Sequence, residues 1–166
     1  GEGVKVLVMD TGVDLSHNEL KNTSIDGYNY IDNNRDITDY EGHGTHVASL
    51  IVGRNTGVAP NCQLDVVKVL DNNARGSHTS VVDGINHAIY HNYNVVCMSL
   101  GINGNLSPLF RQRVVDAYSK GIVLVCASGN NGSSKILNPA LMNEVVSVGG
   151  LDKDNNKRKC TEEIKA

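Results

Sequence analysis

Several features that would decide the class of this protein at once are missing from its sequence. No apolar run is long enough to span a bilayer, and residues 1–4 lack the basic and then apolar pattern of a signal peptide. No stripe of lysine and arginine is present, and the single basic cluster, residues 157–159, is too short to indicate nucleic-acid binding. We therefore expect no membrane span and no nucleic-acid partner. With 40% hydrophobic and 20% charged residues, an ordinary globular domain is expected.

The cysteines also lack an informative pattern. They are Cys62, Cys97, Cys126 and Cys160. None is in a C-x-x-C arrangement, which argues against a zinc or redox motif. Cys97 and Cys126 lie inside apolar runs, where a free cysteine behaves as a small hydrophobic side chain. Neither a disulfide pairing nor a cellular compartment follows from them.

Apolar runs alternate with amphipathic stretches along the chain. The apolar runs are rich in β-branched residues and predict strands buried on both faces, at residues 4–9, 64–70, 95–100, 122–127 and 145–148. Helical patterns cover residues 47–52, residues 81–89 with Thr79 or Ser80 as N-cap, and a stretch that starts at Ser107 and Pro108 and ends before Gly121. The polar residues 21–41, rich in Asn and Asp, predict a long surface connection.

This alternation predicts an α/β fold, in which a mostly parallel sheet carries helices on both faces. The 166 residues are enough for one such domain, and no internal repeat suggests a second. Binding sites in these sheets lie beyond the carboxyl ends of the strands. Asp10 and Asn130 follow predicted strands, and His43 precedes the first predicted helix. We expect this acid, this amide and this base to meet at one edge of the sheet.

A nucleotide-binding domain is the least favoured α/β alternative. No G-x-G-x-x-G follows the first predicted strand, and no G-x-x-x-x-G-K-[ST] occurs.

Three segments carry the chemistry of the site. They read D-T-G-V-D at residues 10–14, G-H-G-T-H-V-A at residues 42–48 and S-G-N-N-G at residues 128–132. In content and order they resemble the subtilisin-like serine proteases, the subtilases, and G-V-A-P at 57–60, V-K-V-L at 67–70 and M-S-L-G at 98–101 fit the same pattern. The resemblance runs from about residue 4 to about residue 157 and implies the N-terminal part of a three-layer subtilase catalytic domain, lacking the C-terminal part.

The resemblance implies a role for each of three catalytic residues. His43 would be the general base, Asp10 would hold its tautomer and stabilise the imidazolium, and Asn130 would donate its side-chain N–H to the developing oxyanion. Each residue taken alone has a plainer explanation, as a loop-capping carboxylate, a helix-opening histidine and a turn asparagine. Their joint occurrence in this order favours catalysis.

The resemblance also implies a groove that binds an extended peptide or protein substrate by strand addition. The implied substrate-binding residues are Ala74, Arg75 and Gly76 on one edge, Ser99, Leu100 and Gly101 on the other, and Ala127, Ser128 and Gly129 in the primary pocket. An inhibitory prodomain is a second candidate partner.

The nucleophile of the family lies in a G-T-S-M-A-x-P segment, which does not occur in these 166 residues. Ser49 lies within an apolar helix, Ser128 in the pocket wall, and Ser133 and Ser134 in a loop, so none is favoured as a replacement. We expect a partial sequence that is inactive alone, with exposed apolar surface on strands such as residues 95–100, and a parent chain that is a serine endopeptidase. The alternative is a pseudoprotease that binds peptides or a prodomain without cleaving them.

No cofactor and no metal site are predicted. Subtilases often bind calcium through an insertion after the helix of the base, but residues 50–58 are too short to contain it. A weaker calcium site at the Asp/Asn-rich residues 32–39 stays open but is not predicted. His43 and His46 lack a third metal ligand at suitable spacing. The resemblance implies that His46 is buried, that His17 packs within the acid motif, and that the protein is secreted or extracytoplasmic.

Overall fold

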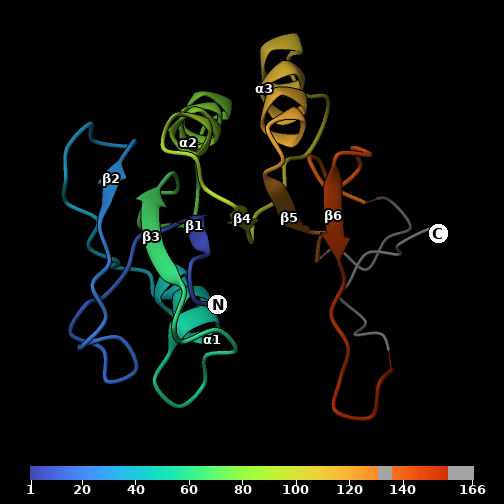
Figure 1. Ribbon diagram of the computed structural model, residues 1–166. Coiled ribbons are helices and arrows are strands. Elements are labelled where there is room, and N and C mark those ends of the chain that lie inside the picture. The colour runs from blue at the N-terminus through green and yellow to red at the C-terminus, as the bar shows by residue number, and fades with distance from the viewer. Residues whose placement is uncertain (131–135, 157–166) are drawn as a thin grey trace.

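A parallel sheet lies at the centre of the computed structural model, which describes residues 1–130 and 136–156. Its strands are β1 (Lys5–Asp10), β2 (Gly27–Asn29), β3 (Gln63–Lys68), β4 (Val95–Met98), β5 (Val123–Ala127) and β6 (Val145–Val148). They lie in the order β2-β3-β1-β4-β5-β6, and every neighbouring pair is parallel. The helices are α1 (His43–Val52), α2 (His78–Tyr90) and α3 (Pro108–Ser119). In Figure 1, α2 and α3 cover one face of the sheet and α1 lies on the other, which confirms the predicted fold class.

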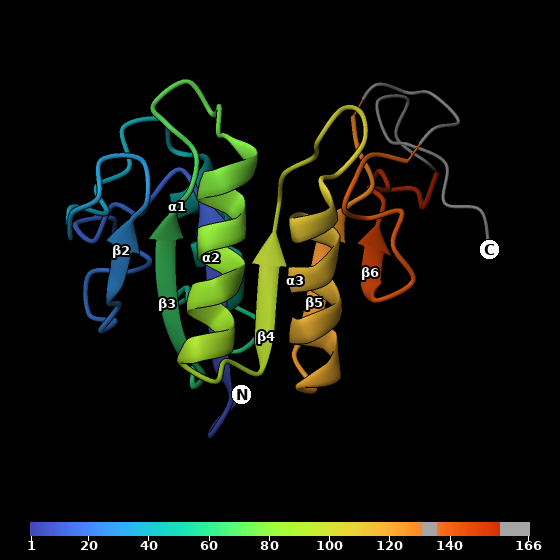
Figure 2. The same ribbon diagram turned by 90° about the horizontal axis from the view of Figure 1, so that it is seen from above.

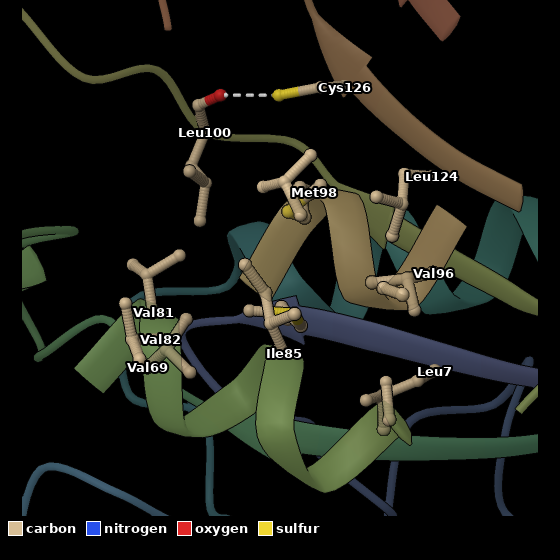
Figure 3. Packing of buried hydrophobic residues seen from close by; sticks show 14 of the residues in the cluster. Leu7, Val69, Val81, Val82, Ile85, Val96, Met98, Leu100, Leu124 and Cys126 are labelled. Carbon is tan, nitrogen blue, oxygen red and sulfur yellow. Dashed lines mark hydrogen bonds between the residues drawn. The ribbon is translucent and has the colours of Figure 1, made fainter. Parts of the chain in front are cut away.

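Burial on both faces explains why the strands read as continuous apolar runs. In β1, Leu7 and Met9 belong to the core under α2 and α3, whereas Val6 and Val8 belong to the core on the α1 side. Figure 3 shows the first of these cores, where Ile85 of α2 packs towards the strand side chains. Burying each aliphatic side chain of this size contributes about 1.5–3 kcal/mol to stability.

The path of the chain through the sheet creates the place for a site. From β1 the chain reaches β3 on one side, then crosses over by α2 to β4 on the other side of β1. Figure 2 shows α2 lying across the sheet between β3 and β4. A reversal of this kind opens a crevice beyond the carboxyl ends of the two strands that flank it, here β1 and β4.

Helix starts were predicted with mixed success. Ser107 caps α3 by accepting from Phe110 N (3.2 Å), and Pro108 is its first residue, as predicted. For α2 the prediction was wrong by two to three residues, because Ser77 is the N-cap and forms a reciprocal capping box with Ser80. Ser80 is therefore the partner of the cap.

Two further differences concern residues 21–47. The edge strand β2 lies within the predicted surface connection, because three residues in a polar context give no periodic signal. Helix α1 begins at His43 and so includes the glycine-containing turn that precedes its apolar stretch. Within the described ranges, no helix combines the length and apolar character needed to cross a membrane.

The turn that follows α1 is held by the carboxylate of Glu19. It accepts from Asn55 N (2.7 Å), Asn55 Nδ2 (2.8 Å), Thr56 N (3.2 Å) and Thr56 Oγ1 (3.2 Å). These hydrogen bonds lower the pKa of Glu19 to about 2, and the bond from the Asn55 side chain has the largest effect on it. The contact ties the loop between β1 and β2 to the short segment where the calcium insertion was expected to be missing. The absence of calcium there stays a prediction.

Glu19→Gln is expected to lower the midpoint of thermal unfolding at neutral pH. The folded-state pKa of Glu19 is depressed, so its carboxylate stabilises the fold above the ordinary value of 4.5, and this stabilisation is lost as the pH falls towards about 2. The gap in midpoint between variant and wild type should therefore close across this interval, as measured by circular dichroism. The exposed Glu2→Gln is the matched control. A gap that is independent of pH would contradict the assignment.

The described residues leave part of the sheet covered on one face only. Val123, Val146 and Val148 are 48%, 52% and 49% exposed. The neighbouring side chains of Val95 and Cys97 on β4 are partly buried against the α1-side core. In Figure 1, α1 lies beneath β1 and β3, and the described chain has no helix beneath β5 and β6. The expected apolar exposure is therefore greatest on β5 and β6 and smaller on β4. We call Val123, Val146 and Val148 the open valine face.

The open valine face is expected to drive self-association of the 166-residue chain, because contiguous exposed apolar surface favours contact with other molecules. Val146→Thr combined with Val148→Thr should reduce the associated fraction in sedimentation velocity, since threonine preserves strand propensity and adds a hydroxyl. Val58→Thr is the control, because Val58 is 92% exposed but lies outside this face. Equal association of both variants would contradict the prediction.

Candidate active site

The carboxylate of Asp10 and the imidazole of His43 are in direct contact. Asp10 is the last residue of β1 and is fully buried, and His43 is the first residue of α1. His43 Nδ1 lies 2.7 Å from Asp10 Oδ1, a distance typical of a charge-assisted hydrogen bond. Because a carboxylate can only accept, Nδ1 donates, and the neutral ring then keeps an acceptor lone pair on Nε2. The contact gives His43 the tautomer that a general base requires.

The surroundings of His43 favour its protonated form. The hydrogen bond to Asp10 raises the pKa of His43, burial opposes this rise, and the negative charges of Asp10, Glu41 and Asp39 add to it. Thr11 N donates to Asp10 Oδ1 (2.7 Å), whereas the buried Oδ2 has no hydrogen-bond partner among residues 1–130 and 136–156. A base with this environment is well suited to hold a proton for the length of one reaction step.

Helix α1 starts without a cap of its own. Gly42 at the N-cap position has φ 103°, and no side chain at that position caps the helix. The first amides instead donate to side chains from outside the helix, namely His43 N to Glu41 Oε2 (2.8 Å), Gly44 N to Thr11 Oγ1 (2.9 Å) and Thr45 N to Asp39 Oδ2 (2.9 Å). These contacts satisfy donors that every helix start leaves free, and the two carboxylates also lie at the favourable end of the helix dipole. The start of α1 is thereby fastened to the end of β1.

A close approach of backbone to backbone completes this attachment. A side-chain carbon on Gly44 would lie 2.1 Å from the carbonyl oxygen of Gly12. Only glycine lets α1 come this near to the turn after β1. The glycine between His43 and Thr45 is therefore required by the geometry of the site.

A groove of ≈ 500 Å³ brings together both predicted substrate-binding edges and the base. Residues 74–76 and residues 99–101 line it together with His43, and so do Glu41 and Leu70, which sequence reasoning missed. The edge at residues 74–76 is braced by Asp71, whose Oδ1 accepts from Asn73 N (2.8 Å) and Arg75 N (2.9 Å). Both edges are thus held beside His43.

A second pocket of ≈ 320 Å³ lies beyond the carboxyl ends of β4 and β5. Ala127, Gly129, Asn130 and Ser99 line it, and Ser99 also lines the groove that contains His43. Ser128 does not line this pocket, because it is only 1% exposed. Its hydroxyl has no hydrogen-bond partner within the described chain. Asn130 therefore lies at the same rim as Asp10 and His43. Its role and those of the groove residues stay predictions.

Two histidines differ from what the resemblance implied. His46 is exposed rather than buried, because the buried face of α1 is formed by Gly44, Thr45, Ala48, Ser49 and Val52. His17 is also exposed, and its Nδ1 accepts from Glu19 N (3.3 Å). No group of three or more potential ligands in the described residues is arranged to hold a metal ion. Asn131, Gly132, Ser133, Ser134 and Cys160 lie outside the described residues.

Sequence reasoning also missed Asp39. Burial alone would raise the pKa of Asp39, but hydrogen bonds from Thr45, Gly42 and Thr11 outweigh it and hold the pKa at about 2. Asp39 was considered only as part of a weak calcium site. The sequence did contain a signal for its role. Asp39 and Glu41 lie four and two residues before His43, and acidic residues are typical of a helix start.

The fold and the site together define a class of protein. A parallel α/β sheet carries a carboxylate–imidazole pair at its carboxyl rim, beside a groove with two backbone edges, and in such a pair the carboxylate orients the imidazole. A sequence profile described as the subtilase family matches residues 1–162. The chain belongs to this family.

Relatives support this membership. The major intracellular serine protease of Bacillus subtilis strain 168 is 39% identical, over 91% of this chain and 52% of that protein. The intracellular serine protease of Paenibacillus polymyxa is 36% identical, over 94% and 52%. A crystal structure of a cold-adapted subtilisin-like serine proteinase matches with a TM-score of 0.88 at 33% identity, over 97% of this chain and 59% of that one. The chain thus spans little more than half of each.

The prediction of a secreted or extracytoplasmic location is wrong. It was drawn from the resemblance alone, and two relatives are named as intracellular serine proteases. Location depends on targeting segments rather than on the fold of a catalytic domain. Membership of the family therefore does not imply secretion.

Glu41→Gln is expected to lower the pKa of His43, measured from the pH titration of its imidazole resonances by NMR. The charge of Glu41 helps to raise this pKa in the wild type, so its removal makes the imidazolium less stable and moves the titration to lower pH. Glu2→Gln is the control, since it removes the same charge at the opposite end of β1. An equal shift in both variants, or none in Glu41→Gln, would contradict the electrostatic account.

Proposed function

We propose that the complete protein is a serine endopeptidase that cleaves peptide bonds in extended substrates. The observation that carries this proposal is the 2.7 Å contact between Asp10 and His43 at the rim of a subtilase sheet. A serine hydroxyl is a weak nucleophile near neutral pH, and it needs a base that is itself oriented by an acid. Asp10 and His43 have the geometry of such an acid and base.

In the proposed mechanism His43 takes the proton of a serine hydroxyl as that oxygen attacks the scissile carbonyl. Asp10 stabilises the imidazolium that forms, and it stays ionised throughout. Asn130 donates its side-chain N–H to the oxyanion of the tetrahedral intermediate. His43 then returns the proton to the leaving amine, which breaks the peptide bond and leaves an acyl-enzyme for hydrolysis.

We propose that the substrate lies as an added strand between residues 74–76 and residues 99–101. Main-chain hydrogen bonds along the two edges would supply affinity, and side-chain pockets would supply preference. Because successive side chains of an extended chain point in opposite directions, one would enter the pocket of Ala127 and Gly129 and the next would lie towards His43.

The nucleophile is proposed to come from a part of the protein outside these 166 residues. Within them no G-T-S-M-A-x-P segment occurs. Ser49 is unsuited, since its hydroxyl donates to Thr45 O (2.8 Å) inside α1, and Ser128 is buried. The open valine face supports the proposal, because a helix packed on it would bury Val146 and Val148 next to the pocket that contains Asn130.

The absence of that segment also favours one alternative, a pseudoprotease that binds peptides or a prodomain along the same two edges. The two functions differ in whether the full-length gene product cleaves peptides and forms a covalent bond with a serine-directed phosphonate.

The full-length gene product is expected to cleave internally quenched peptides and to be labelled by a fluorophosphonate probe, whereas the 166-residue chain does neither. His43→Ala should lower kcat by about 10⁶-fold, the magnitude known for the equivalent loss in subtilisin, a member of this family. His46→Ala is the matched control, because His46 is exposed on the same helix and should leave kcat unchanged. Peptide binding without cleavage or labelling would favour the pseudoprotease. Labelling of the 166-residue chain alone would overturn the assignment of the nucleophile.

A further inference from the structure

The carboxylate of Asp39 accepts five hydrogen bonds close to the site. None of them comes from the side chain of Asp10 or His43. Asp39 Oδ1 accepts from Thr11 Oγ1 (2.9 Å), Glu41 N (3.1 Å) and Gly42 N (2.9 Å). Its Oδ2 accepts from Thr45 N (2.9 Å) and Thr45 Oγ1 (2.6 Å). A carboxylate offers about four lone-pair positions, so these contacts saturate it.

The partners of Asp39 belong to the two elements that carry the catalytic pair. Thr11 is the residue after Asp10, and its amide donates to Asp10 Oδ1 (2.7 Å). Thr45 lies two residues after His43 in the first turn of α1. The Thr11 hydroxyl also accepts from Gly44 N (2.9 Å), so a continuous set of hydrogen bonds runs from Asp10 through Thr11 and Asp39 to the backbone on both sides of His43.

We propose that Asp39 is a positioning residue, which sets the separation and orientation of Asp10 and His43 by fastening the end of β1 to the first turn of α1. The effect on catalysis rests on the proposed endopeptidase function, whereas the effect on the Asp10–His43 contact does not. Asp39 accepts from Thr11, next to the end of β1, and from Thr45 in the first turn of α1, so one side chain joins the two elements outside the Asp10–His43 contact itself.

A carboxylate suits this position better than an amide of the same shape. All five partners of Asp39 donate to it, and three of them are backbone amides that cannot change role. An asparagine would turn an N–H₂ group towards some of these donors and leave them unpaired. The negative charge also lies at the start of α1, where it is favourable with respect to the helix dipole.

Asp36 provides a matched control within the same loop. Its Oδ1 accepts from Thr38 N (3.0 Å) and Thr38 Oγ1 (2.6 Å), the same pair of contacts that Asp39 makes with Thr45. Asp36 is exposed, and these contacts stay within the loop. Asp36→Asn therefore removes an equal charge and an equal local contact without loosening β1 from α1.

The first arm of the test is kinetic and uses the full-length gene product. Asp39→Asn should lower kcat roughly 10- to 100-fold, the cost expected when a catalytic group is displaced by about 1 Å. KM should change far less, because residues 74–76 and 99–101 lie on other elements. Asp36→Asn should leave both parameters within about two-fold of the wild type, as expected for a surface site away from the machinery.

The second arm is spectroscopic and reads the contact itself. The proton that His43 Nδ1 shares with Asp10 should give a low-field resonance in the wild type and in Asp36→Asn. In Asp39→Asn this resonance should move towards ordinary imidazole values or broaden through exchange. A purely structural role of Asp39 would lower the melting temperature and leave the resonance of the folded molecules unchanged.

Thr11 supplies a test that does not alter Asp39. Thr11→Val keeps the shape of the side chain and removes the hydroxyl that links Asp39 to Gly44, whereas Thr11→Ser keeps the hydroxyl. Thr11→Val should lower kcat and shift the resonance as Asp39→Asn does, and Thr11→Ser should be much closer to the wild type. Adding Asp39→Asn to Thr11→Val should lower kcat little further, because both changes break the same connection between β1 and α1.

The outcomes separate the two proposals. If the wild type fails to cleave peptides, the endopeptidase proposal fails, and the resonance alone decides the role of Asp39. If the wild type cleaves and Asp39→Asn keeps both its kcat and its resonance, the positioning role is overturned and the function stands. If Asp39→Asn does not fold, the Thr11 pair decides, and equal behaviour of Thr11→Val and Thr11→Ser overturns the proposal.

Discussion

The uncapped start of α1 is the constraint on which the site depends. A helix leaves its first amides without partners, and here those amides reach across to Glu41, Thr11 and Asp39. The need to satisfy them draws α1 against the turn after β1, as close as Gly44 permits. The short contact between a buried carboxylate and a partly exposed imidazole follows from this attachment. Ordinary helix energetics thus bring together two residues that lie 33 positions apart.

The sheet determines where the other residues of the site lie relative to this attachment. Parallel strands end at the same rim, so the segments after β1, β4 and β5 are neighbours although they are far apart in the chain. The crossover by α2 places the reversal of strand order beside β1, where the crevice opens. Ser99 lines both the groove of His43 and the pocket of Asn130 and so joins the two. The parallel α/β fold is that of the subtilase family, to which the chain belongs.

Two local features of the chain could not be derived from its likeness to the family. The turn after α1 is closed by a carboxylate, Glu19, that accepts from Asn55 and Thr56. His46 faces outwards, because the helical period turns it away from the sheet side of α1. A family pattern identifies which residues occupy a position, but the helix period and the local partners decide what each side chain contacts.

The sequence by itself determined the strands at residues 145–148 and near residues 5–10, the capped start of α3 at Ser107, and the presence of an acid, a base and an amide at strand and helix ends. These features are local, since they depend on apolar period, turn chemistry and neighbouring residues. Only the tertiary structure decided that β2 pairs with β3, that Ser77 rather than Ser80 caps α2, and that Asp39 joins Thr11 to Thr45. Hydrogen bonds between side chains distant in sequence leave no periodic trace, because their partners meet only after the sheet has formed.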